Sequence, residues 1–201
     1  MENIGGKSSC DLFIIMERIK SEYKQQLQKY REQAENNHRL WNISEKSAEL
    51  LFMLVLIYKP KRILEIGTSN GYSTFWLSLA AEKCNAIIET IEFDKARFKL
   101  AKENLKGRSN IAQHLGRAEL IIPETTTKYD FVFIDSGKID YIVHLNLLLD
   151  KLEDNALIVA DNVISHNKSV KEYLDFIKSH PSFVSMTLPI EAGLEISIFK
   201  Q

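Results

Sequence analysis

The sequence has few of the features that mark several large classes of protein. It contains only two cysteines, Cys10 and Cys84, which excludes a disulfide framework. The longest apolar stretch, Leu50–Tyr58, is far too short for a membrane span, and the N-terminus shows no apolar core of a signal peptide. We therefore expect a cytoplasmic protein with reduced thiols and no membrane partner.

An excess of charge of one sign is also absent. The chain has 26 Lys and Arg against 27 Asp and Glu, a net charge of -1. No overall positive field is available to attract nucleic acid, although a local basic patch could still do so. The 201 residues are 45% hydrophobic and 26% charged, which is typical of a globular protein and excludes disorder.

The N-terminal part differs from the rest. Residues 1–10 are expected to form a loose leader, and apolar residues at steps of three and four over 11–40 predict one amphipathic helix. That helix would pack on its own domain; a lid over a site or a homodimer contact is the alternative. We divide the chain into a leader and helical arm at 1–40 and a main domain at 41–201.

The main domain alternates between helix and strand patterns. Helices are predicted at 44–58, 71–83, 94–106, 139–152 and 168–179, with a short one ending at residue 122. Strands are predicted at 61–67, 86–92, 111–115, 129–135, 156–161, 183–188 and 194–200. This alternation predicts an α/β fold with a mostly parallel, doubly wound sheet. The final pair predicts an antiparallel strand near one edge, and ligands should bind at the carboxyl ends of the strands.

The first strand is followed by a glycine-bracketed turn. Gly67 and Gly71 allow positive φ and close backbone approach to a ligand. Their G-x-x-x-G spacing differs from that of pyrophosphate binders. Glu65 adds a carboxylate that disfavours a phosphate and favours a cation or hydroxyls. The alternative is a purely structural turn.

The second strand ends at Glu92, 25 residues beyond Gly67. An acidic residue at this place in nucleotide-binding sheets accepts hydrogen bonds from the ribose hydroxyls. Glu65, Glu92 and the glycines together indicate an adenosine-containing ligand without a diphosphate. Asp94 is better explained as the N-cap of the next helix.

Oxygen-bearing side chains follow the fourth and fifth strands. Asp135 follows the fourth strand, and Asp161 and Asn162 follow the fifth. These strand ends should be neighbours, and carboxylate and amide oxygens suit Mg²⁺ or a similar divalent cation. Lys138, three residues past Asp135, is a candidate base. The alternatives are that the Asp and Asn residues only form turns at the strand ends, and that Lys138 is an exposed, solvated lysine.

These motifs resemble one family. LEIGTSNGYS, TIEFD, FVFIDSGKIDY, LIVADNVI and GLEISIF make residues 40–200 similar to the cation-dependent S-adenosylmethionine O-methyltransferases. That group includes catechol and caffeoyl-coenzyme A O-methyltransferases and bacterial relatives that act on small phenols or a hydroxylated wobble uridine of tRNA. The resemblance implies a Rossmann-like class I methyltransferase domain over 41–201, with a seven-stranded sheet and N-terminal helices.

The resemblance also implies residue roles. The donor would be held by Asn42, Ile43, Glu65, Gly67, Ser69, Ser73, Glu92, Gly116, Ala118 and Asp135. Within that set, Ser73 would lie near the methionine carboxylate, Glu92 at the ribose, and Gly116 and Ala118 at the adenine. The cation, expected to be Mg²⁺, would be bound by Asp135, Asp161 and Asn162. Asp135 would also lie near the donor methyl, and Lys138 would be the general base.

We therefore expect a metal-dependent O-methyltransferase that acts on a small phenolic, catechol-like acceptor. A tRNA wobble hydroxyuridine O-methyltransferase is the alternative within the family. The segment Gly116–Glu119 departs from the family pattern through Arg117 and Glu119. Outside the family, the alternatives are a non-catalytic S-adenosylmethionine-binding module and a dinucleotide-linked oxidoreductase, which the glycine spacing disfavours.

Overall fold

The computed structural model describes residues 10–201, and side chains from residue 14 onward. The leader expected over residues 1–10 lies outside the described residues except for Cys10, where the first helix begins, and the Cys10 side chain lies outside them too. The chain divides into two compact units, residues 1–40 and residues 41–201. No helix between residues 10 and 201 is both long and apolar enough to cross a membrane.

The first unit contains two helices where the sequence predicts one. Helix α1 spans Cys10–Glu22 and α2 spans Lys24–Asn36. The prediction of a single helix over 11–40 is wrong because Tyr23 leaves helical geometry, with φ -105° and ψ 20°. At the other end, Asn37 is extended, with φ -141° and ψ 99°, so the helix ends before Leu40.

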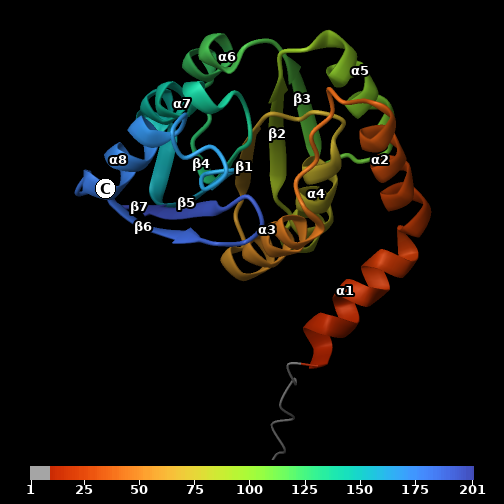
Figure 1. The fold of residues 1–201 in the computed structure, drawn as a ribbon. Coiled ribbons are helices and arrows are strands. Elements are labelled where there is room, and N and C mark those ends of the chain that lie inside the picture. Colours follow the sequence, from red (N-terminus) through yellow and green to blue (C-terminus); the bar gives the residue numbers. More distant parts are fainter. Residues whose placement is uncertain (1–9) are drawn as a thin grey trace, which may run out of the picture. The chain divides into compact units, whose positions relative to one another are not determined.

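The second unit is built on a seven-stranded sheet of order β3-β2-β1-β4-β5-β7-β6 (Figure 1). The strands are β1 (Arg62–Ile66), β2 (Ile87–Glu92), β3 (Ile111–Leu115), β4 (Tyr129–Ile134), β5 (Leu152–Asp161), β6 (Phe183–Leu188) and β7 (Leu194–Phe199). Neighbours among β1 to β5 are parallel, and β7 is antiparallel to both β5 and β6. The predicted seven-stranded, mostly parallel sheet with an antiparallel C-terminal strand is confirmed.

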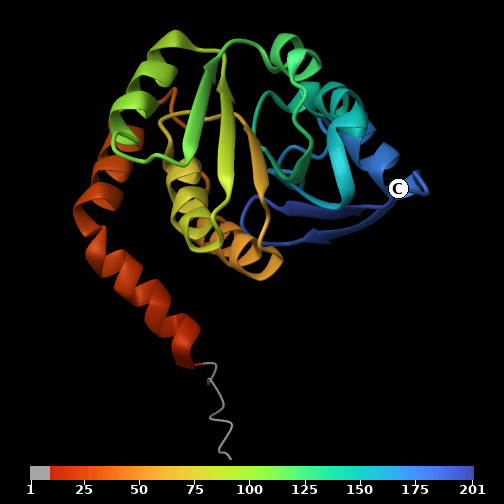
Figure 2. The same cartoon turned by 180° about the vertical axis from the view of Figure 1, so that it is seen from behind.

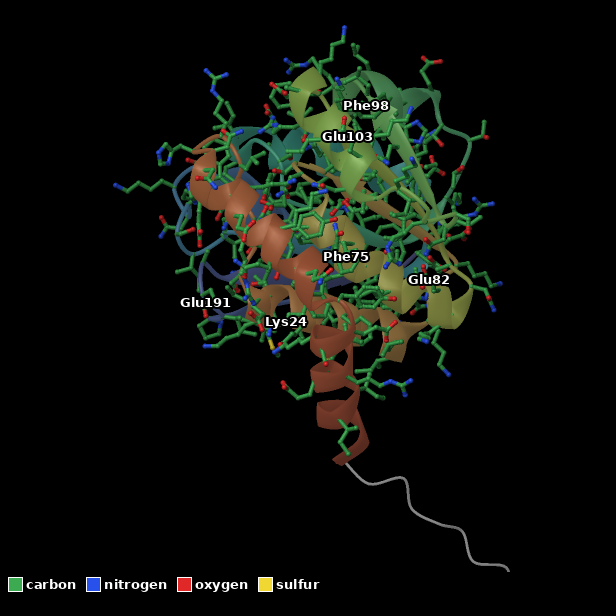
Figure 3. All side chains as sticks on the ribbon, turned by 90° about the vertical axis from the view of Figure 1, so that its right-hand side faces the viewer. Lys24, Phe75, Glu82, Phe98, Glu103 and Glu191 are labelled. Carbon is green, nitrogen blue, oxygen red and sulfur yellow. The ribbon has the colours of Figure 1, made fainter. Side chains whose placement is uncertain are left out.

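Helices cover both faces of this sheet, as a doubly wound fold requires (Figures 1 and 2). One layer contains α3 (Glu45–Tyr58), α4 (Tyr72–Cys84) and α5 (Lys95–Asn104); the other contains α6 (Ala118–Glu124), α7 (Tyr141–Leu148) and α8 (Lys171–Ser179). Glu82 on α4 and Glu103 on α5 are exposed side chains of the first layer (Figure 3).

Two helix predictions need correction. The helix predicted at 139–152 is α7 with a short 3-10 turn on each side, at 138–140 and 149–151, because β5 already begins at Leu152. The helix predicted from residue 168 begins at Lys171, since the preceding eight residues, 163–170, form turns.

The central strands are buried on both faces, and their register aligns their carboxyl ends. Ile66 of β1 pairs with Ile134 of β4, which pairs with Ala160 of β5. Burying an isoleucine side chain such as that of Ile66 or Ile134 contributes roughly 1.5–3 kcal/mol, so the register is firmly specified. The next residues along these strands, Gly67, Asp135 and Asp161, therefore lie side by side at one edge of the sheet.

The start of α5 depends on the side chain of Asp94. Its carboxylate accepts hydrogen bonds from the amides of Ala96 (2.8 Å) and Arg97 (2.9 Å), and so caps α5. Asp94→Ala is expected to lower the free energy of unfolding by about 1 kcal/mol in urea denaturation. Asp94→Asn keeps a capping oxygen and should lose much less; equal losses in the two variants would contradict the capping role.

Candidate functional site

Backbone hydrogen bonds extend the sheet by one residue beyond several strand ends. The amide of Gly67 donates to Ile91, that of Asp135 to Ile66 and that of Gly116 to Glu92, each at 2.9 Å. Three of the predicted site residues, Gly67, Asp135 and Gly116, are therefore held in place by the sheet itself.

Gly67 lies directly against the fourth strand end. Its φ is +106°, and a Cβ atom at this position would lie 2.1 Å from the carbonyl oxygen of Asp135. Any other residue would push the Asp135 backbone away or strain the turn. The glycine is thus required for the close approach of the β1 turn to Asp135.

A small cavity lies at this edge. It is lined by six of the predicted donor-binding residues, namely Asn42, Ile43, Gly67, Ser69, Ser73 and Asp135, together with Trp41, Thr68, Asn70 and Tyr72. The Ser69 hydroxyl is buried and has no hydrogen-bond partner among the described residues. It is therefore available to a ligand.

Glu65 lies behind the wall of this cavity and does not line it. The side chain is fully buried, and its carboxylate accepts hydrogen bonds from Ser73 (2.6 Å), Thr90 (2.6 Å) and Thr74. Glu65 therefore contacts the cavity lining through the Ser73 hydroxyl, and its direct contact with a donor stays a prediction. Burial raises the pKa of Glu65 to about 7, although the three hydroxyls act against this shift.

Glu92 is the last residue of β2 and is nearly buried, with 3% exposed. One carboxylate oxygen accepts from the amide of Ser69 at 2.8 Å. The other accepts from the amide of Asp94 and from Arg97, both at 2.9 Å. These contacts fix the carboxylate in one orientation. Ribose hydroxyls would donate to the carboxylate lone pairs that these contacts leave free.

The fourth and fifth strand ends bring the predicted catalytic residues together. The Lys138 ammonium lies 2.6 Å from Asp135 Oδ1 and 2.9 Å from the Tyr141 hydroxyl, which donates to the Asp161 carbonyl oxygen at 3.0 Å. Burial and the two nearby carboxylates raise the pKa of Tyr141 well above its usual value, so this hydroxyl keeps its proton. Tyr141, which the sequence did not single out, ties Lys138 to the Asp161 strand end.

Asp161 is only 3% exposed and accepts a hydrogen bond from the Asn162 amide at 2.8 Å. Burial, and then the negative charge of Asp135, raise its pKa to about 6. Two carboxylates that repel each other in a buried site fit a divalent cation, since the cation removes the repulsion. Among the described side chains, residues 14–201, no group of three His, Cys, Asp or Glu residues could hold a metal. The predicted set adds the Asn162 amide oxygen to the two carboxylates.

A larger cavity of about 250 Å³ borders Lys138 on the α8 side. Its apolar wall comes from Ile139, Ile142 and Tyr173, and Lys168, Ser169 and Glu172 add polar groups. The sequence gives no sign of this cavity, because its lining comes from two separate stretches of chain, 138–142 and 168–173, that only the fold brings together. Gly116 and Ala118, the predicted adenine residues, line neither cavity; they lie in the loop after β3 and at the start of α6.

Comparison with known sequences gives a consistent match. A sequence model of the O-methyltransferase family matches residues 16–187. A catechol O-methyltransferase of Niastella koreensis is 32% identical over 138 residues, and one of Mycobacterium tuberculosis is 30% identical over 130. These matches cover 65% and 61% of this chain but only 62% and 57% of those proteins.

Solved structures show the same architecture. The O-methyltransferase TomG from Streptomyces achromogenes, involved in tomaymycin synthesis and solved in complex with SAM, aligns with a TM-score of 0.79 at 25% identity, over 88% of this chain and 90% of that one. The SAH-bound methyltransferase PaMTH1 of Podospora anserina aligns over 100% of both chains, with a TM-score of 0.80 at 18% identity. The expected Rossmann-like class I methyltransferase fold is thereby confirmed.

The buried Glu65 carboxyl predicts an unusual pH dependence of stability. Its pKa is higher in the folded state, at about 7, than its ordinary value of 4.5, so the folded state binds the extra proton between these values. Stability should therefore fall as the pH rises through this window. Relative to Glu65→Gln, which cannot titrate, the wild type should lose about 3 kcal/mol, measured by urea denaturation across the window. A difference that stays constant with pH would contradict this account.

Proposed function

The chain belongs to the O-methyltransferase family, and we propose that it transfers the methyl group of S-adenosylmethionine to a hydroxyl of a small phenolic, catechol-like acceptor. The acceptor oxygen attacks the methyl carbon, the carbon–sulfur bond breaks, and S-adenosylhomocysteine leaves. Lys138, the proposed base, takes the hydroxyl proton after it has released a proton of its own ammonium group to solvent. Positioning of the two reactants supplies much of the rate enhancement.

One observation supports this proposal above the others: Asp135 belongs to two groups of residues at once. It lines the cavity formed by the glycine turn and by Asn42 and Ile43, and its Oδ1 lies 2.6 Å from Lys138. A methyl donor held in that cavity would have its reactive end beside Asp135. The acceptor hydroxyl, the base and the methyl group then meet at one strand end.

The donor-binding residues have defined tasks in this proposal. Asn42 and Ile43 enclose the methionine part, and Ser73, whose hydroxyl is held by Glu65, lies near its carboxylate. Glu92 accepts from the ribose hydroxyls with the lone pairs that its own contacts leave free. The buried Ser69 hydroxyl supplies a further polar contact.

We propose that Asp135, Asp161 and Asn162 would hold a divalent cation, Mg²⁺ by the chemistry of their oxygens. When bound, such an ion lowers the pKa of an acceptor hydroxyl and fixes its direction. The buried carboxylate of Asp161 supports this assignment, because a raised pKa next to a second carboxylate indicates a place for positive charge. Lys138 supplies part of that charge.

The 250 Å³ cavity beside Lys138 supports a small acceptor. Ile139, Ile142 and Tyr173 provide apolar surface for one aromatic ring, and the hydroxyl end of that ring would point to Lys138. A tRNA base is the alternative acceptor. It would be recognised in the assay below by methyl transfer to hydroxylated tRNA and none to phenols.

Methyl transfer tests the proposed function. With labelled S-adenosylmethionine, Mg²⁺ and a panel of catechols and tRNA, the wild type should be active, and a chelator should abolish the activity. Asp161→Asn should lower the rate at least a hundredfold, since one ligand charge is lost. Its affinity for S-adenosylhomocysteine, measured by calorimetry, should stay within about threefold of wild type. The exposed Asp150→Asn serves as the matched control. Full activity of Asp161→Asn in chelator would contradict the proposal.

The Asp161 carboxyl also predicts how cation affinity depends on pH. Because its pKa is about 6, a bound ion must displace a proton below that pH. Mn²⁺ affinity, measured by electron paramagnetic resonance, should rise about tenfold per pH unit below 6 and level off above it. Asp161→Asn should bind weakly, without that rise. A wild-type affinity that does not change between about pH 5 and pH 7 would exclude Asp161 as a ligand.

A further inference from the structure

The segment that follows β5 is held by the turn between the last two strands, residues 189–193. The amide of Val163 donates to the Gly193 carbonyl oxygen at 3.0 Å. The next two amides along the chain both donate to the carbonyl oxygen of Ala192, at 3.0 and 2.9 Å. Three consecutive amides directly after Asn162 are therefore bonded to two adjacent carbonyls of the β6–β7 turn.

Asn162 itself does not join this ladder of hydrogen bonds. Asp161 pairs with Leu194 of β7, whereas the Asn162 amide donates to the Asp161 carboxylate at 2.8 Å, and the φ of Asn162 is +62°. Asn162 is thus an extra residue between two ladder contacts, as in a β-bulge. Successive side chains of a regular strand point to opposite faces, which would direct Asp161 and Asn162 apart. The bulge breaks that alternation at the residue whose amide oxygen is assigned to the cation.

Gly193 permits this close approach because it lacks a side chain. Its φ is +88°, and a Cβ atom there would lie 2.3 Å from Cγ1 and 2.6 Å from Cβ of Ile164. Rotation of the Ile164 side chain moves Cγ1 away but leaves Cβ in place, so any other residue at position 193 forces the two backbones apart. The hydrogen bonds from Val163 onward then lengthen, and Asn162 shifts with them.

We propose that Gly193 is a positioning residue for the cation site: the close approach that it permits at Ile164 sets the place of Asn162. The inference rests on the proposed function, because it assumes that Asp135, Asp161 and Asn162 hold the cation. The sheet register places the two carboxylates, and the β6–β7 turn places the amide oxygen. The cavity assigned to the donor contains no residue of this turn or of the segment it holds, so donor binding is independent of Gly193.

Mn²⁺ binding to the full chain, measured by electron paramagnetic resonance, tests this inference. Gly193→Ala should lower the Mn²⁺ affinity by about tenfold or more, as the loss of a group that orients a metal ligand does. Its affinity for S-adenosylhomocysteine, measured by calorimetry, should stay within about threefold of wild type. Because Ile164 is 45% exposed, the displaced segment can move outward without opening the core, and circular dichroism should show an intact fold.

Gly107→Ala is the matched control. The φ of Gly107 is +91°, close to that of Gly193, but an added Cβ atom there meets nothing within 4 Å. Gly107→Ala should lower the urea midpoint through the same backbone strain and keep the wild-type Mn²⁺ affinity. The comparison separates a loss of stability from a loss of positioning.

Two double variants identify the contact responsible. Gly193→Ala combined with Ile164→Gly removes both clashing atoms and should restore most of the Mn²⁺ affinity, whereas its combination with Ile164→Ala keeps the Cβ atom and should not. If Gly193→Ala does not fold, the Ile164→Gly double variant decides: recovered Mn²⁺ binding supports the inference, and a folded protein that binds weakly overturns it.

A folded Gly193→Ala that binds Mn²⁺ as tightly as wild type would overturn the inference but leave the proposed function standing. Equal Mn²⁺ affinities of the two double variants would also overturn it. If the wild type itself bound no Mn²⁺, the proposed cation site would be wrong, and the inference with it.

Discussion

The register of three parallel strands is the constraint on which the candidate site depends. Ile66, Ile134 and Ala160 are paired across β1, β4 and β5, so the residues that follow them meet at one edge of the sheet. A shift of one strand by a single residue would turn its side chains to the other face and separate Asp135 from Asp161. The apolar core that fixes this register is therefore also what brings the two carboxylates together.

The same edge stores unfavourable electrostatic energy. Glu65 is fully buried and Asp161 nearly so. Burial raises the pKa of Glu65 to about 7, and burial together with the negative charge of Asp135 raises that of Asp161 to about 6. A sheet selected for stability alone would place apolar residues at these positions. Their presence is explained if Glu65 orients the hydroxyls of the turn and the Asp161 carboxylate binds the cation proposed for this site. Stability and chemistry thus compete at the same few residues.

Much of this arrangement could be predicted from the sequence. The spacing of the apolar residues indicates the helices and strands, and the polar residues directly after the strands indicate the site. The alternation of short apolar runs with helical patterns predicts the sheet, and Asp135 and Asp161 are recognisable as the residues that follow its strands. The direct role expected for Glu65 could not be judged, since sequence does not reveal that Ser73, Thr74 and Thr90 enclose it. The same is true of Tyr141, whose partners Lys138 and Asp161 come from separate elements. The break at Tyr23 had no sequence signal in the apolar periodicity.

The central claim is that a divalent ion at Asp135, Asp161 and Asn162 lies next to the reactive methyl of the donor. Nuclear magnetic resonance of S-adenosylmethionine carrying a ¹³C-labelled methyl group tests this claim most directly, with Mn²⁺ as a paramagnetic probe. The account predicts strong broadening of the methyl signal of the bound donor in the wild type and its loss in Asp161→Asn. A bound donor whose methyl signal Mn²⁺ leaves sharp in the wild type would contradict it.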